Sequence, residues 1–345
     1  RHEAFRASFE IVNDKPVQRI HGDLATDEHG RTRTLIKVFG SPETFFQKGF
    51  WLPEAIIKSF IQPFDLSQAP LLRVGLAKLD ERRHLLMVDM HHIISDGVSI
   101  DILINDFTAL YKGEELPAVR VQYKDYAEWQ NRERESLLLQ GKYWETEFAG
   151  EIPILELPTD YTRPSVQSFE GNSVSFEIAA GISDTLKALA LEAGATIYMV
   201  LLALYAVFMA RITGQEDIVV GSPAAGRRHA DLEKIIGMFV NTLPLRNFPV
   251  GEKTFGEFLY EVKERSLSAY ENQDYQYEDL VERVVTNRDA SRNPLFDTMF
   301  TLQNTGSQTL KIPGLKLTPY EYENKTSKFD ISLTAEEVES QLMLT

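Results

Sequence analysis

Short apolar runs predict strands in the first half of the chain, and helical periodicity follows them. Each run contains Leu together with Ile, Val or Met. Between 98 and 113 the apolar residues instead recur every three or four positions, and Gly113 is the expected C-cap. The pattern therefore predicts a helix at 98–113 after strands at 33–40, 71–80 and 83–93.

Two helical stretches are predicted within 123–148, and three prolines then fall within 152–165. Proline removes a backbone donor and breaks regular structure, so this segment is the best linker candidate. We therefore expect an N-terminal lobe at 1–155, whose start at Arg1 suggests that it is cut from a longer chain, and a C-terminal lobe at 156–345.

The second half of the chain repeats the same kinds of element. Ser183 and Thr196 are candidate helix caps, and a further helix is expected at about 255–271. The apolar run 197–212 is shorter than the roughly 20 residues that span a bilayer, so it predicts a buried helix. Strands are expected at 168–178, 216–223, 240–250 and 296–304. Strands mixed with helices in both halves predict an α/β fold of two similar lobes.

Composition narrows the possible functions. The chain has 345 residues, which is long for a single core, and its net charge of −15 argues against binding to nucleic acid or to anionic membranes. It has no cysteine, which excludes disulfides, thiolate nucleophiles and cysteine metal sites. No signal peptide is visible, and we expect a cytoplasmic protein.

The segment MHHIISDGVS, at 90–99, carries the candidate chemistry. If the strand continues through it, His92 extends an apolar row and His91 lies on the opposite face near Asp89. A partly desolvated imidazole stays neutral, as a base requires, so His92 is the candidate base and His91 a structural residue. A histidine that merely completes the core remains the alternative.

Asp96 and Gly97 are expected in the turn before the helix. The carboxylate can accept backbone N–H bonds or an arginine, and glycine allows a positive φ or a close backbone approach. The Gly97 N–H, at the helix N-terminus, can face a developing negative charge. Adjacent histidines do not suit ligation of a metal from one face, and the spacing shows no nucleophile elbow or phosphate-binding loop.

These residues form the pattern HHxxxDG, which resembles the core motif of condensation domains of nonribosomal peptide synthetases, in the chloramphenicol-acetyltransferase-like superfamily. Further motifs occur in the family's order, although Asn272 and Gln276 replace the family's usual histidine and proline. The matching segments are RHEAFRASF (1–9), YKDYAEWQ (123–130), IIGMFVNTLPLR (235–246), NQDYQYEDLVE (272–282) and RDASRNPLFDTMF (288–300).

The resemblance implies amide bond formation between a donor aminoacyl or peptidyl thioester and an acceptor aminoacyl thioester. Both are carried on phosphopantetheine arms of peptidyl carrier domains, with an adenylation domain as neighbour and no cofactor or metal of the domain's own. The arms are expected to meet in a tunnel between two lobes that form a V.

The same resemblance assigns roles to residues. His92 takes the proton or positions the amine, and Gly97 offers its N–H to the reacting carbonyl. Asp96 is expected to hold the loop through Arg292, with Arg288 or Arg246 as alternatives. The candidates for lining the tunnel are Ser222, Gly226, Asn241 and Thr242.

Three rival functions stay open at this point. An epimerization domain shares the fold and HHxxxDG but usually differs around the later motifs. A free-standing acyltransferase would use coenzyme A thioesters. A non-catalytic platform would recruit partner enzymes, although such relatives typically lose the second histidine or the aspartate, and both are present here.

Overall fold

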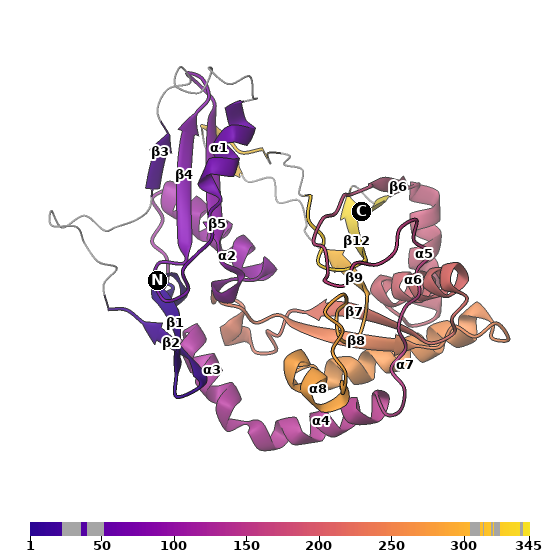
Figure 1. Ribbon diagram of the computed structural model, residues 1–345. Helices are drawn as coiled ribbons and strands as arrows, with labels where there is room; N and C mark the ends of the chain where they lie inside the picture. The colour runs from indigo at the N-terminus through magenta and orange to yellow at the C-terminus, as the bar shows by residue number, and fades with distance from the viewer. Residues whose placement is uncertain are drawn as a thin grey trace. The chain divides into compact units, whose positions relative to one another are not determined.

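The computed structural model divides the chain into two compact units, which are described separately below (Figure 1). The first unit comprises Arg1–Arg132, Arg227–Phe239 and Lys311–Tyr322, and the second comprises Glu133–Gly226, Val240–Leu310 and Glu323–Thr345. The structure describes residues 1–22, 36–39, 52–303, 311–312, 314–318, 320, 325–338 and 341–345. Parts of two predicted strands, at 33–35, 40 and 304, lie outside these residues.

The first unit is built around a three-stranded sheet in the order β3-β4-β5. Strand β3 is parallel to β4, and β5 is antiparallel to β4. One face of the sheet packs against helix α1 through Phe60, Leu85 and Met87, which are buried. The helices and strands of this unit are η1 (Glu3–Arg6), β1 (Ala7–Val12), β2 (Lys15–Ile20), β3 (Ile36–Phe39), α1 (Leu52–Phe60), β4 (Leu72–Lys78), β5 (His84–Met90), η4 (His92–Ile94), α2 (Gly97–Tyr111), α3 (Tyr123–Arg132), η5 (Ala230–Leu232), β10 (Lys311–Ile312) and β11 (Leu315–Lys316).

The second unit is built on a mixed six-stranded sheet in the order β6-β13-β12-β9-β7-β8. Strand β9 runs parallel to both of its neighbours, whereas the β7–β8 and β12–β13 pairs are antiparallel. The elements of this unit are α4 (Arg134–Glu147), β6 (Phe176–Ile178), α5 (Ala180–Glu192), α6 (Ile197–Thr213), β7 (Ile218–Ala224), β8 (Asn241–Asn247), α7 (Phe255–Glu271), α8 (Tyr277–Val284), β9 (Thr298–Gln303), β12 (Ile331–Val338) and β13 (Gln341–Leu344).

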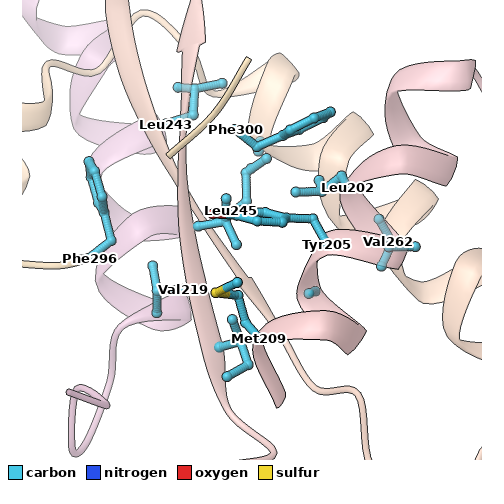
Figure 2. Packing of buried hydrophobic residues seen from close by; sticks show 14 of the residues in the cluster. Leu202, Tyr205, Met209, Val219, Leu243, Leu245, Val262, Phe296 and Phe300 are labelled. Carbon is cyan, nitrogen blue, oxygen red and sulfur yellow. The ribbon is translucent and has the colours of Figure 1, made fainter. Parts of the chain in front are cut away.

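Helix α6 lies at the centre of the second core. Thr196 caps it by accepting the Met199 N–H at 3.3 Å, and Gly214 ends it with a φ of +72°. In Figure 2, Tyr205 and Met209 of this helix point toward the sheet, in which strand β8 carries Leu243 and Leu245. The cap predicted at Thr196 and the buried helix predicted after it are both confirmed. A helix that is apolar on all sides is stable only when a core surrounds it.

Within the described residues, no single helix is long and apolar enough to cross a membrane. Helices α5 and α6 are long and apolar enough only when taken together, and the chain bends by 107° between them.

Two predictions for the second unit need correction. Helix α5 begins at Ala180, so Ser183 lies inside it rather than capping it. The Ser183 hydroxyl donates to the Ile178 carbonyl and accepts the Leu342 N–H. Of the strand predicted at 168–178, only β6 forms a strand.

The boundary between the units also differs from the predicted one. The proline-rich segment 152–165 belongs to the second unit, where Leu155 is buried and the Arg163 guanidinium pairs with Asp330. Helix α4 contributes buried Trp144 to the same core, and its C-cap residue Phe148 is buried there as well. The chain therefore first enters the second unit after Arg132, and not after residue 155.

Candidate active site

The histidine segment joins strand β5 to helix α2 in the first unit. Strand β5 ends at Met90, and His91 remains extended with φ −69° and ψ 135°. The 3-10 turn η4 begins at His92, and α2 begins at Gly97. The predicted order of strand, tight loop and helix is confirmed, with one turn of 3-10 helix inside the loop.

The two faces of β5 differ in burial as the alternation requires. Leu85 and Met87 are buried, whereas Leu86 and Val88 are 42% and 44% exposed. His92 follows the exposed row and is itself exposed. The prediction that His92 ends a partly desolvated row is therefore wrong within this structure, because α1 covers the other face of the sheet. The imidazole is accessible to a reactant.

The His91 ring is fixed by its neighbours. Its Nδ1 accepts the Ile93 N–H at 3.1 Å, so in the neutral ring the proton is on Nε2. Its edge faces the Phe64 ring at a centroid distance of 6.2 Å. Asp89 forms its ion pair with the Arg73 guanidinium at 3.3 Å, and it interacts with the nearby His91 through its charge. Burial raises the pKa of Asp89, although the charge of Arg73 opposes the shift.

Asp96 is the buried polar centre of the loop, and its side chain is 3% exposed. Its Oδ1 accepts the Ser99 N–H at 2.8 Å and so caps α2. Its Oδ2 accepts the Phe239 N–H at 3.0 Å. The Arg227 Nη2 donates to both carboxylate oxygens, at 2.8 and 3.0 Å. A buried carboxylate with this many donors is held firmly in one orientation.

Arg227 joins Asp96 to the segment 227–239. Its Nη1 donates to the carbonyls of Leu232 and Ile235 at 2.9 and 2.8 Å. Its guanidinium lies 4.0 Å over the Phe239 ring. One side chain therefore neutralises the carboxylate and shapes the segment that surrounds it.

Tyr123 of α3 packs against the end of segment 227–239. Its hydroxyl donates to the Met238 carbonyl at 3.0 Å, and its ring meets Phe239 edge-on at 5.1 Å. A Cβ at Gly237 would lie 2.2 Å from the Tyr123 Cδ2, so this contact requires glycine. Burial raises the pKa of Tyr123, and the negative charge of Asp96 adds to the shift.

The arginines predicted to pair with Asp96 have other roles in the second unit. Arg292 pairs with Asp297 at 2.9 Å, and Arg246 pairs with Asp217 at 2.6 Å. Arg288 is exposed in the segment after α8. The prediction is wrong because carboxylates of the same unit hold Arg292 and Arg246.

Gly97 is the first residue of α2 and is exposed. Its φ lies outside the left-handed region, so the positive φ that glycine permits is not used here. A Cβ placed on it would meet no atom within 4 Å, which leaves open space beside its backbone. The N–H of the first helical residue has no partner inside the helix, so it can donate to a ligand.

The four residues predicted to line a tunnel lie in the second unit. Ser222 is buried and accepts the Tyr198 hydroxyl at 2.6 Å. The Asn241 amide donates to the carbonyls of Gln273 and Tyr275 and accepts the N–H groups of Thr242 and Tyr277. All hydrogen-bonding positions of this amide are thus used within the unit, which supports a structural role.

The remaining tunnel candidates have intermediate exposure. Thr242 lies next to Asn241 on β8, and Gly226 has a φ of +65° directly before the chain enters the first unit. Their predicted role at a tunnel stays a prediction. Among the described residues, no three acidic or histidine side chains gather in a way that would hold a metal ion.

Sequence reasoning missed two residues of this site, Arg227 and Ser99. Arg227 ends the segment GSPAAGR, and Ser99 follows the HHxxxDG motif by two positions. The available signal was an arginine directly after a glycine, in a stretch otherwise expected to be a loop. Only the fold brings it to Asp96, 131 positions earlier in the chain.

The sequence of this chain is similar to that of known proteins. The sequence model of the family described as "Condensation domain" matches residues 1–345. Surfactin synthase subunit 1 of Bacillus subtilis (strain 168) is 48% identical over 344 residues, which cover 99% of this chain and 9% of that protein. Tyrocidine synthase 3 of Brevibacillus parabrevis is 49% identical over 339 residues, covering 98% of this chain and 5% of that protein. The chain thus spans less than a tenth of either relative.

Solved structures share the fold. The X-domain from teicoplanin biosynthesis superposes with a TM-score of 0.84 at 25% identity, over 100% of this chain and 78% of that chain. The condensation domain of the Monacolin K polyketide synthase MokA gives a TM-score of 0.79 at 21% identity, over 99% of this chain and 79% of that chain. The predicted α/β fold class of two units with mixed sheets and flanking helices is confirmed.

Proposed function

Because the chain belongs to the condensation-domain family, we propose that it forms an amide bond between two acyl groups held as thioesters on carrier domains. The observation that carries the proposal is the HHxxxDG loop. It leaves His92 and Gly97 exposed while the buried Asp96–Arg227 pair fixes the backbone between them. A rigid loop with an accessible imidazole and an accessible N–H suits acyl transfer.

The proposed reaction requires little chemical activation by the protein. The acceptor amine attacks the donor carbonyl, the new C–N bond forms, and the C–S bond breaks to release the donor arm as a thiol. A thioester is already activated, so the residues mainly orient the amine and manage one proton. His92 takes that proton or positions the amine, and the Gly97 N–H stabilises the negative charge that develops on the carbonyl oxygen.

The proposed partners are the donor and acceptor peptidyl carrier domains and a neighbouring adenylation domain. Phosphopantetheine arrives on the carriers, and the domain binds no cofactor of its own. Two similar proteins, surfactin synthase subunit 1 and tyrocidine synthase 3, are named as synthases, which supports a role in assembling a peptide. The order of the later motifs favours condensation over epimerization.

The test is a two-carrier assay with the chain in its natural polypeptide context. A donor aminoacyl carrier and an acceptor aminoacyl carrier are supplied, and the dipeptidyl product on the acceptor is measured. Loss of a general base typically costs about 10²–10⁴-fold in rate, so His92→Ala should fall by that factor. His84→Ala, which removes another exposed histidine of the same unit, is the matched control and should keep the wild-type rate.

Two outcomes would contradict the proposal. Unchanged product formation by His92→Ala would favour a platform that only recruits other enzymes. Exchange of deuterium from the solvent into the Cα position of a single carrier-bound residue, without any dipeptide, would favour epimerization.

A further inference from the structure

We propose that Ser99 is a positioning residue for amide formation, whose hydroxyl holds the Asp96 carboxylate and the Gly237 backbone in register with the first turn of α2. The inference rests on the proposed function, because it explains how the loop between His92 and Gly97 is kept in one conformation. Ser99 is fully buried and therefore touches no substrate.

The Ser99 hydroxyl lies at the meeting point of three segments. Its Oγ is 2.7 Å from the Asp96 Oδ1 and 3.1 Å from the Arg227 Nη2. It is also 2.9 Å from the Gly237 carbonyl oxygen and 3.1 Å from the Gly237 nitrogen. No atom of the side chain other than this oxygen is polar, so one group serves all of these contacts.

The hydroxyl has a fixed capacity. It donates one hydrogen and accepts two, so the N–H groups of Gly237 and Arg227 fill its lone pairs and one hydrogen serves two acceptors. The shorter distance and the negative charge favour the carboxylate as the main acceptor. The hydroxyl is therefore saturated, and its orientation is determined by the partners around it.

This arrangement reaches the reacting groups through the backbone. Asp96 directly precedes Gly97, and its side chain is held at one oxygen by Ser99 and at the other by Phe239. The direction of the Gly97 N–H depends on the backbone torsions of these two residues. A donor that is misplaced by about 1 Å can lose as much as a hundredfold in rate.

The substitution Ser99→Ala tests the proposal with little change in volume. Asp96 keeps the Ser99 N–H, the Arg227 guanidinium and the Phe239 N–H, so the cap and the ion pair remain. The Gly237 N–H loses its acceptor, and the carboxylate loses one donor. We expect a folded protein with a less rigid loop.

The matched control is Ser183→Ala in the second unit. Ser183 is also fully buried in a helix, and its hydroxyl also joins backbone groups of other segments. The same atoms are removed, but far along the chain from the HHxxxDG loop. A loss of rate that comes only from weaker packing should appear equally in both variants.

In the two-carrier assay, Ser99→Ala should lower kcat by about 10- to 100-fold and leave KM for each carrier within about twofold. Ser183→Ala should keep both constants. A wild-type kcat in Ser99→Ala, or an equal loss in Ser183→Ala, would overturn the proposal. A change confined to KM would overturn it as well, since the residue would then act on binding.

Amide hydrogen exchange tests the same inference without turnover. Ser99→Ala should speed exchange at residues 96–99 and 237–239, whereas Ser183→Ala should leave both segments unchanged. If no carrier pair gives product even with the wild-type chain, the proposed function fails, and the exchange result still decides whether Ser99 orders the loop. Unchanged exchange at both segments would refute that ordering.

Discussion

Removing the Arg227 guanidinium should destabilise the first unit strongly. The change Arg227→Met keeps much of the side-chain volume but leaves the Asp96 carboxylate buried without its positive partner. It also removes the hydrogen bonds from Arg227 to the carbonyls of Leu232 and Ile235, although the Leu232 carbonyl keeps the Ile235 N–H. Breaking a buried ion pair from one side typically costs about 3–5 kcal/mol.

The structure favours the lower end of that range. Asp96 would still accept hydrogen bonds from the Ser99 N–H, the Ser99 hydroxyl and the Phe239 N–H, so part of its charge stays compensated. We therefore expect a loss of about 3 kcal/mol, a large share of the 5–15 kcal/mol that stabilises a typical domain. The double variant Asp96→Asn with Arg227→Met should recover part of this loss, because no charge is then left buried.

Urea unfolding at neutral pH, followed by circular dichroism, measures the effect. Arg120→Met is the control, since Arg120 reaches the same segment at Asp231 over 3.8 Å but its side chain is 84% exposed. An exposed pair contributes below about 1 kcal/mol. If Arg227→Met cost no more than Arg120→Met, the reasoning that the buried pair holds segment 227–239 would be refuted.

Two further variants probe the packing. Gly237→Ala should lower the free energy of unfolding by about 2 kcal/mol, because the added Cβ would overlap the Tyr123 ring. Calorimetry measures this loss. A loss near zero would mean that the ring moves aside freely and would contradict the prediction. Burial raises the pKa of Tyr205 to about 12, above that of an exposed tyrosine, so the folded state holds this proton more tightly. Its contribution to stability is therefore present below pH 10 and is lost as the pH rises toward 12. Tyr205→Phe, which removes the contact with the Thr298 hydroxyl, should flatten this alkaline decline in urea titrations, and an unchanged slope would contradict the assignment.

The local secondary structure was predictable from the sequence. The cap at Thr196, the strand before the histidines and the helix after them depend on residues within a few positions of each other. Alternation also separated the two faces of β5 correctly. It did not reveal which face is covered, because helix α1 decides that and lies more than 20 positions earlier in the chain.

The partner of Asp96 was not predictable in this way. The chain has 36 lysines and arginines, and nothing in the local pattern singles out Arg227 among them. The pairing depends on the return of segment 227–239 to the first unit, which is a property of the whole topology. Ser99 was missed for the same reason, since three of the four hydrogen-bond contacts of its hydroxyl are with that segment.

The distribution of the first unit over separate stretches of chain limits how such domains can be recombined. A chimera whose crossover falls between positions 96 and 227 takes the carboxylate from one parent and the guanidinium from the other. If the two parents differ in how segment 227–239 is folded, the hybrid inherits a buried charge that its new partner does not reach. Grafting this unit between proteins therefore requires transplanting 227–239 and 311–322 along with 1–132.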